Sequence, residues 1–275
     1  AASDVYKRQL PCLIALIYRE KEGWAYFIVA MISILLGQLM SMRKPKDYVI
    51  YLKEGCVATS LSWILMGVVG AIPFMITGEI PSFINALFEM VSGFTTTGSS
   101  IIPDVEVLPH CLLFWRSFTH WIGGMGVLVF VLVVTSLDRK NSMYLMRAEV
   151  PGPEKDKLVP KAMSSARILY GMYLILTVIE MVFLVIGGMN LFDSMIFSFG
   201  SAGTGGFSNY ADSVAHFNSA YIDGVITVFC ALFGVNFALF YFMILGDFKA
   251  ILKNEELRTY TVSYTHLTLP TNSLV

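Results

Sequence analysis

The chain has 275 residues, of which 56% are hydrophobic and only 14% are charged. A soluble domain carries nearer to a quarter of charged residues, so this composition indicates a membrane protein. The formal net charge of −1 excludes the basic surface that nucleic-acid-binding proteins use, and no nucleic acid is expected as a partner. The four cysteines are far apart and form no pair with metal-ligand spacing, so neither a zinc site nor a disulfide framework is expected.

The two ends of the chain differ in character from the rest. Residues 1–9 (AASDVYKRQ) and 262–271 (VSYTHLTLPT) resemble translations of the two strands of one sequencing adapter, and 272–275 would then be index sequence. We therefore expect 1–9 and 262–275 to be adapter-derived tails and the natural sequence to run from about 10 to 261. Both tails are excluded from the fold prediction.

Five apolar stretches are long enough to cross a hydrocarbon core of about 30 Å. They cover residues 23–42, 55–78, 109–137, 162–188 and 218–246, and a shorter one near 10–18 is interpreted as the stump of a truncated helix. Two further apolar segments, 81–94 and 191–200, are too short to cross. Each is followed at once by small residues, TTTGSS at 95–100 and SAGTGGFS at 201–208.

The basic residues test this topology. Lys and Arg gather between the first and second spans, between the third and fourth, and after the fifth. These basic clusters lie on the same side of the membrane only if both short segments enter the membrane from the outside and return to the outside. The positive-inside rule therefore predicts two re-entrant segments, with the basic loops 43–53 and 138–161 in the cytoplasm. Re-entrant backbone is tolerated only where it is buried in protein or lines a watery cavity, so a pore or cavity is predicted.

The same order of elements occurs twice, with Thr97-Gly98 and Thr204-Gly205 predicted to occupy matching positions 107 residues apart. The fold class is an all-α polytopic membrane protein with tandem repeats of helix, re-entrant pore loop and helix, which can surround a central path. The predicted segments are N-terminal membrane helices and a cytoplasmic loop at 10–54, a first pore repeat at 55–137, a cytoplasmic linker at 138–161, a second pore repeat at 162–246, and the start of the next cytoplasmic segment at 247–261.

The small-residue loops have the chemistry of a cation filter. A short helix that ends at a Thr/Gly run can point backbone carbonyls at a central axis, where they replace the water shell of a potassium ion. Glycine reaches φ values that other residues avoid, and the carboxyl end of a helix favours a nearby cation. Plain turns between helices are the alternative, but the paired occurrence on one side favours a filter. The candidate potassium-binding residues are Thr96, Thr97, Gly98, Gly203, Thr204 and Gly205.

Ionisable residues at membrane depth need a reason. Glu89 in the first short segment and Arg116 in the third span are interpreted first as a buried structural pair. Alternatively, Glu89 is a cation attractor or a partner that braces the filter through Arg116. His120 has no second ligand at metal-binding spacing, so it is interpreted as a satisfied core histidine. Asp193 opens the second short segment, where its carboxylate is predicted to cap the helix. Glu180 in the fourth span receives no role.

The motif WIGGMG at 121–126 places three glycines inside a span. Small residues let helices approach closely, so the motif predicts either packing against a re-entrant loop or a gating hinge. Nucleophile-elbow, zinc-protease and phosphate-loop motifs are absent from the sequence, and no enzymatic activity is expected.

Four segments, FEMVSGFTTTGSS, WRSFTHWIGGMGVLVF, RAEVPGPEKDKL and FSFGSAGTGGFSNY, resemble the membrane subunit of bacterial Trk-type potassium uptake systems, in the Trk/Ktr/HKT superfamily. The resemblance spans about 10–258. It implies four membrane–pore loop–membrane repeats around one path, with potassium bound by one filter glycine per repeat, here Gly98 and Gly205. In plant relatives serine at the first filter position goes with sodium permeation, so Gly98 implies a potassium preference.

The resemblance also implies a homodimer in the bacterial inner membrane, with a cytoplasmic nucleotide-binding regulatory subunit. Only the first two of the four repeats are present, so uptake is expected of the parent protein and not of this fragment alone. A sodium-permeable or sodium-coupled member of the superfamily is the main alternative. A membrane enzyme whose glycine-rich loops bind lipid or phosphate is a second alternative; it would need an intramembrane acid/base pair or metal cluster near the loops, and the sequence offers none. A non-conducting scaffold is a third alternative, and it would tolerate serine at the filter glycines.

Overall fold

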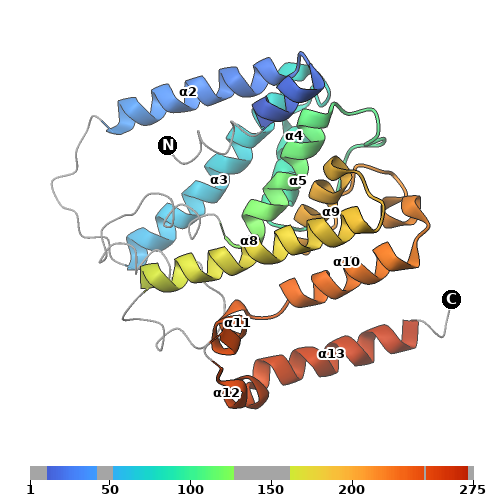
Figure 1. Cartoon of the computed structure of the whole chain (residues 1–275). Coiled ribbons are helices and arrows are strands. Elements are labelled where there is room, and N and C mark those ends of the chain that lie inside the picture. The colour runs from blue at the N-terminus through green and yellow to red at the C-terminus, as the bar shows by residue number, and fades with distance from the viewer. Residues whose placement is uncertain (1–10, 42–51, 127–161, 245, 272–275) are drawn as a thin grey trace.

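The computed structural model describes residues 11–41, 52–126, 162–244 and 246–271. Within these ranges every regular element is a helix (Figure 1), as the all-α prediction requires. The predicted linker 138–161, the second half of the third predicted span and the basic residues 43–46 lie outside the described residues. The cytoplasmic placement of the two basic loops therefore stays a prediction.

Three long helices coincide with predicted spans: α2 (Gly23–Ser41), α3 (Leu52–Thr77) and α8 (Ala162–Ile186). Two stretches within them, Thr59–Thr77 and Ile168–Ile186, are long and apolar enough to cross a membrane. Helices α3 and α8, which contain these stretches, expose large apolar side chains along their length. Such surfaces suit lipid, because acyl chains are as apolar as the side chains themselves.

The two short segments form helices of 12 residues each, α4 (Phe83–Phe94) and α9 (Leu191–Ala202). At 1.5 Å per residue such a helix is roughly 18 Å long, too short to cross the bilayer. Helix α4 packs between α3 and α5 (His110–Gly124), and α9 packs between α8 and α10 (Ala220–Phe233). Helix α5 also packs against α9, so it joins the two groups of helices.

The fifth predicted span is not one helix, and the prediction of a continuous span over 218–246 is wrong. Helix α10 ends at Phe233, and the chain resumes as α11 (Phe237–Ile244), α12 (Phe248–Lys253) and α13 (Glu255–Thr271). At the break, the Asn236 side chain donates a 2.9 Å hydrogen bond to Glu256 of α13. A hydropathy pattern cannot detect this break, since the partner of Asn236 lies in another helix. Helix α13 also continues through 262–271, which the sequence analysis excluded.

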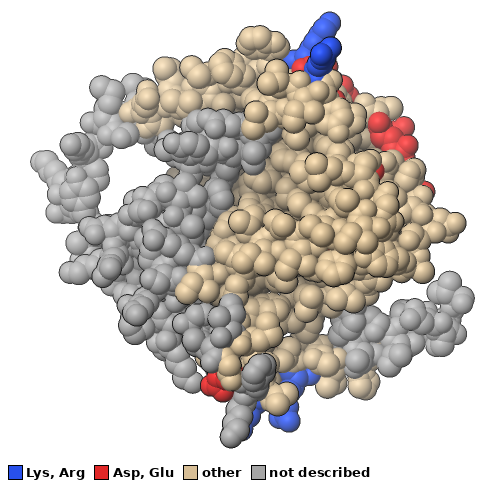
Figure 2. Space-filling model, viewed as in Figure 1, with Lys and Arg blue, Asp and Glu red and all other residues tan. Residues whose placement is uncertain are grey.

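The described charged side chains lie at the margins of the visible surface. Figure 2 shows them near the start of α2, on the upper right edge where Asp and Glu gather, and around α12, with a broad region of other residues in between. This distribution is typical of a protein that spans a membrane, because charges are costly in the hydrocarbon core and cluster at its interfaces. The structure is therefore that of a polytopic membrane protein.

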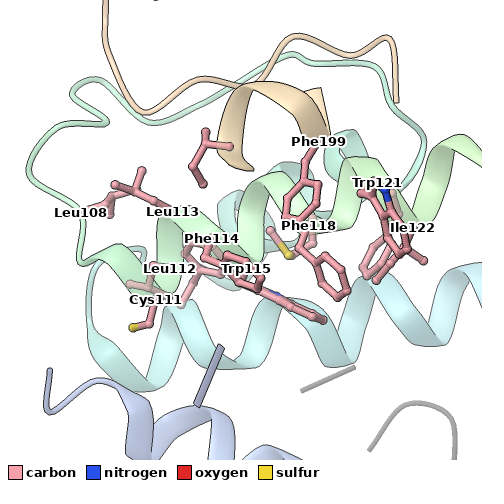
Figure 3. Close-up of a cluster of buried hydrophobic side chains, with 14 of the residues drawn as sticks. Leu108, Cys111, Leu112, Leu113, Phe114, Trp115, Phe118, Trp121, Ile122 and Phe199 are labelled. Carbon is pink, nitrogen blue, oxygen red and sulfur yellow. The ribbon is translucent and has the colours of Figure 1, made fainter. Parts of the chain in front are cut away.

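The core is built around the aromatic side chains of α5. Phe118 and Trp121 lie 5.6 and 5.9 Å from the Phe199 ring of α9, between ring centroids (Figure 3). The Trp121 indole N–H donates to Thr177 of α8 at 3.1 Å, and the Trp115 indole N–H donates to a backbone carbonyl of α3 at 3.3 Å. Buried indoles with a polar partner combine large apolar contact with orientation. Helix α5 is thereby held against elements of both groups.

A carboxylate from the N-terminal segment caps α5. The Glu20 oxygens accept hydrogen bonds from the backbone N–H groups of His110 (2.7 Å) and Cys111 (2.9 Å). The same carboxylate lies 2.9 Å from His110 Nδ1, and the His110 ring stacks on Tyr18 at 4.1 Å. A carboxylate at a helix amino end satisfies free N–H groups and opposes the helix dipole. Burial would raise the pKa of Glu20, but these hydrogen bonds lower it below its ordinary value.

We expect Glu20→Gln to lower the melting temperature of the full-length protein at neutral pH and to flatten its dependence on acid. A carboxyl whose folded pKa is lowered contributes fully above its unfolded value, about 4.3, and loses that contribution as the pH falls through the folded value. Thermal unfolding in detergent across the acid range measures both effects. Glu79→Gln, at an exposed carboxylate, is the control. An acid dependence identical in wild type and Glu20→Gln would contradict the capping role.

Candidate functional site

The loops after α4 and α9 have the same backbone structure. Three consecutive N–H groups at the start of each loop donate to carbonyls of the last helical turn: those of Thr95, Thr96 and Thr97 in the first, and those of Gly203, Thr204 and Gly205 in the second. Positive φ values also recur at matching places: 55° at Thr96 and 53° at Thr204, then 77° at Gly98 and 81° at Gly206. The two residues of each pair, Thr96 with Thr204 and Gly98 with Gly206, are 108 positions apart in the sequence.

The loop register differs from the sequence prediction by one residue. Thr97-Gly98 and Thr204-Gly205 were predicted to match at a separation of 107, but the hydrogen bonds and φ values match at 108. Gly98 therefore corresponds to Gly206, and Gly205 corresponds to Thr97. The physical reason is that the register is set by where each short helix ends, not by the Thr-Gly dipeptides. Ser100 and Ser208 also match at 108, and that identity could have indicated the correct register.

The two loops touch each other at their glycines. A Cβ added to Gly98 would lie 1.8 Å from the carbonyl oxygen of Gly205, a distance that no side chain tolerates. Gly98 also has a φ of 77°, in the left-handed region that favours glycine. The first loop can therefore reach the second only with glycine at position 98. Sequence reasoning paired these glycines as equivalents, but in the structure they are contact partners.

The glycines of WIGGMG lie directly behind both loops. A Cβ on Gly123 would be 2.1 Å from the carbonyl oxygen of Phe94, at the end of α4. A Cβ on Gly124 would be 2.9 Å from the carbonyl oxygen of Ala202, at the end of α9. The interpretation of the motif as close packing against the re-entrant loops is confirmed. One helix backs both loops because two adjacent glycines let it approach both short helices.

A buried ion pair connects the exits of the two loops. Arg116 Nε lies 2.5 Å from Glu89 Oε1, with side-chain exposures of 3% and 0%. The Glu89 carboxylate also accepts hydrogen bonds from the Ser100 hydroxyl (3.0 Å) and the Ile101 N–H (2.9 Å), which follow the first loop. The carboxylate is thus occupied by protein donors. This geometry matches the structural pair considered from the sequence.

The arginine of this pair holds the second loop. Arg116 Nη1 donates to the carbonyl of Ser208 at 2.9 Å, and its guanidinium carbon lies 3.6 Å from the centre of the Phe207 ring. A guanidinium suits this task, because it is planar, offers several donors and stacks on aromatic faces. Because α5 supplies Arg116 and α4 supplies Glu89, a single pair fixes the chain leaving both loops.

Asp193 has a different role from the predicted one. The cap of α9 is Asn190, whose side-chain oxygen accepts the N–H of Asp193 at 2.8 Å. The Asp193 carboxylate instead accepts from the side chains of Asn209 (2.6 Å) and Tyr210 (3.0 Å), which follow the second loop. Helix α9 starts at Leu191, so Asn190 and not Asp193 is the residue that precedes it. Burial, and then the bond to Asp193, raise the pKa of Tyr210 to about 12, so this phenol keeps its proton at neutral pH.

His120 is buried but not satisfied, contrary to the prediction of a satisfied core histidine. Its exposed fraction is 0%, and neither ring nitrogen has a hydrogen-bond partner among the described residues. The ring lies 4.0 Å from that of Phe207 and fills the space beside Gly205, where a Cβ would be 2.5 Å from His120 Nε2. It therefore acts as a shape-filling support behind the second loop. In the described parts of the chain, no group of His, Cys, Asp or Glu is placed to hold a metal ion.

The sequence model of a cation transport protein family, TrkH, matches residues 23–262. The chain belongs to the TrkH family. It is 34% identical over 257 residues to the Trk system potassium uptake protein TrkH of Escherichia coli K12, covering 91% of this chain and 53% of that protein. It is 35% identical over 254 residues to the potassium uptake protein TrkG of the same strain, covering 91% of this chain and 52% of TrkG.

A solved TrkH structure has the same fold. The potassium transporter TrkH from Vibrio parahaemolyticus matches with a TM-score of 0.78 at 28% identity, over 94% of this chain and 53% of that one. The chain thus spans about half the length of the relatives that it matches. Members of the TrkH family are inner-membrane cation transporters, and the membrane fold described above agrees with this assignment.

We expect Glu89→Gln and Arg116→Met each to destabilise the full-length TrkH-family protein by about 3–5 kcal/mol, because each leaves the other charge buried and unpaired. The double variant should recover part of this loss. Thermal unfolding of the four proteins, read as a double-mutant cycle, gives the coupling energy. Asp212→Asn, which removes the partly exposed contact with His216, is the control and should change stability by less than about 1 kcal/mol. Single variants as stable as that control would refute the role of the pair.

Proposed function

We propose that this chain is half of a potassium uptake protein and that its two loops form two walls of a selectivity filter. The observation that carries the proposal is the contact between the loops: two backbones of the same conformation meet at Gly98 and the Gly205 carbonyl, at the ends of two short helices. The relatives named as potassium uptake proteins support the choice of cargo.

The loop carbonyls accept no hydrogen bonds from the described residues, although that of Gly205 faces Gly98. Within the described residues, no hydrogen-bond donor reaches the carbonyl oxygens of Thr96–Gly98 or of Gly203–Gly205, while several N–H groups of both loops are bonded to the preceding helix. Free carbonyl oxygens can replace the water shell of a potassium ion as it enters. The carboxyl ends of α4 and α9 lead directly into the loops and add partial negative charge.

The register found in the structure refines the residues of this filter. Gly98 and Gly206 occupy equivalent places, and Gly205 with Thr97 forms the preceding pair. We therefore include Gly206 with the residues predicted from the sequence: Thr96, Thr97, Gly98, Gly203, Thr204 and Gly205. Glu89 and Arg116 support the filter by fixing the chain that leaves each loop.

The wider architecture is proposed from the family resemblance. Helices α3, α4 and α5 form one repeat and α8, α9 and α10 a second, arranged about an axis along the membrane normal. Two further repeats would complete the path, so this half alone is expected to be inactive. The assembly would be a homodimer in the bacterial inner membrane, with a nucleotide-binding regulatory subunit on its cytoplasmic side.

We expect Gly98→Ser to impair potassium uptake selectively. The gene encoding the full-length protein would be expressed in a bacterium that lacks its own potassium uptake, together with its regulatory subunit, on limiting potassium. Wild type should restore growth, and Gly98→Ser should raise the potassium concentration needed for half-maximal growth about tenfold or more, as a loss of about 1.4 kcal/mol in the filter would. Gly78→Ser is the matched control, because Gly78 also has a positive φ (83°) but open space where its Cβ would lie.

Three outcomes separate the proposals. Growth rescued by wild type and by Gly78→Ser, with the raised potassium requirement for Gly98→Ser at equal membrane expression, supports the filter proposal. Rescue by all three proteins would contradict the place of Gly98 on the ion path. Sodium uptake without potassium uptake by wild type would instead select the sodium-permeable alternative.

A further inference from the structure

Glu180 is a buried acid that the filter proposal does not use. It lies in α8, its exposed fraction is 0%, and neither carboxyl oxygen has a hydrogen-bond partner of good geometry among the described residues. An ionisable group at membrane depth is costly and in most proteins marks an ion or proton site. The other buried acids of the described residues, Glu89 and Asp193, each accept several hydrogen bonds. Glu180 is therefore the exception that needs an explanation.

Among the described residues, no group beside Glu180 offers a counter-charge. The groups that interact with its carboxyl are the Ser201 hydroxyl of α9, the Cys230 thiol of α10 and the Tyr173 phenol of α8 itself. Helix α11, which also packs on α8, has Tyr241 as its one titratable residue. Helix α5 contributes Arg116 and His120, but neither is among the groups that act on Glu180. A carboxylate without a cation in such a place costs several kcal/mol, so the neutral acid is favoured when the site is empty.

Ser201 connects Glu180 to the second loop. The backbone carbonyl of Ser201 accepts the N–H of Thr204 at 2.9 Å, in the turn that opens the loop. Its side chain interacts with both Glu180 and Cys230, and Ser201 is 4% exposed. The first loop has no such arrangement, because the residue 108 positions earlier is Gly93, which has no side chain. Of the two described loops, only the second therefore has this arrangement.

We propose that Glu180 is a proton-binding positioning residue whose ionisation is coupled to cation occupancy of the second loop. This inference rests on the proposed filter function. A potassium ion bound at the loop attracts the negative carboxylate and so favours loss of the proton to water, while the protonated acid offers the ion no such attraction. Linkage makes the effect reciprocal: raising the pH strengthens potassium binding, and potassium binding acidifies Glu180.

The test uses the full-length protein in proteoliposomes, with the potassium concentration for half-maximal flux measured as a function of pH. In wild type this concentration should fall at least about fivefold from acid to alkaline pH, the lower end of typical coupling between sites. Glu180→Gln keeps the shape but cannot ionise, so it should hold the acid-side value at every pH. Glu180→Asp keeps the acid and should retain a pH dependence, and Glu79→Gln, at an exposed carboxylate, should behave as wild type.

A spectroscopic measurement tests the same proton without transport. Infrared difference spectra between potassium-loaded and potassium-free membranes should show loss of the carbonyl stretch of a protonated carboxyl on loading, and this change should be missing in Glu180→Gln. A pH dependence or infrared change that survives Glu180→Gln overturns the inference. Potassium flux that Gly98→Ser abolishes, but that is pH-independent in wild type, overturns it while leaving the filter intact. A wild type that conducts no potassium overturns both.

Discussion

The buried pair of Glu89 and Arg116 is the interaction on which the rest of the site depends. Two charges removed from water are tolerated only when both are paired and hydrogen-bonded. Here the Glu89 carboxylate also accepts a hydrogen bond from the chain that leaves the first loop, and the Arg116 guanidinium donates one to the chain that leaves the second. Because neither charge can be left unpaired, the pair also fixes the positions of two loops that are more than 100 residues apart in the sequence. A single apolar contact could not do this, because it has no direction.

Helix α5 is the element that makes this arrangement possible. Its aromatic face packs on α9, its indoles donate to α3 and α8, and its two adjacent glycines admit the ends of both short helices. The same helix therefore supplies the core, the support behind each loop and one member of the ion pair. Because these contacts are made on different sides of one rigid cylinder, the loops are positioned by packing as well as by hydrogen bonds. The adjoining helices also accept hydrogen bonds from the first N–H groups of both loops.

The two loops share a backbone conformation but differ in their polar partners. After the first loop, Glu89 holds the chain; after the second, Asp193 holds Asn209 and Tyr210 while Arg116 holds Ser208. In the first group Gly93 stands at the position of Ser201, so it offers no hydroxyl like the one beside Glu180. In the proposed filter, the shared backbone conformation would keep the geometry for carbonyl coordination, while the side chains outside the loops differ. The proposed response to protons resides in this difference.

The amino-acid sequence by itself determined the membrane class, the positions of α2, α3 and α8, the two short helices and the loops that follow them. These features depend on local properties, which are the length of an apolar run and the conformational freedom of Gly and Thr. Only the tertiary structure decided that Gly98 meets the Gly205 carbonyl and that equivalent loop residues are 108 positions apart. It also decided that α10 ends at Phe233 and that Asn190 caps α9. It also left the ring nitrogens of His120 and the carboxyl oxygens of Glu180 without a hydrogen bond of good geometry among the described residues. Each of these depends on which groups lie opposite one another in space, and one-dimensional patterns of hydropathy and charge do not contain that information.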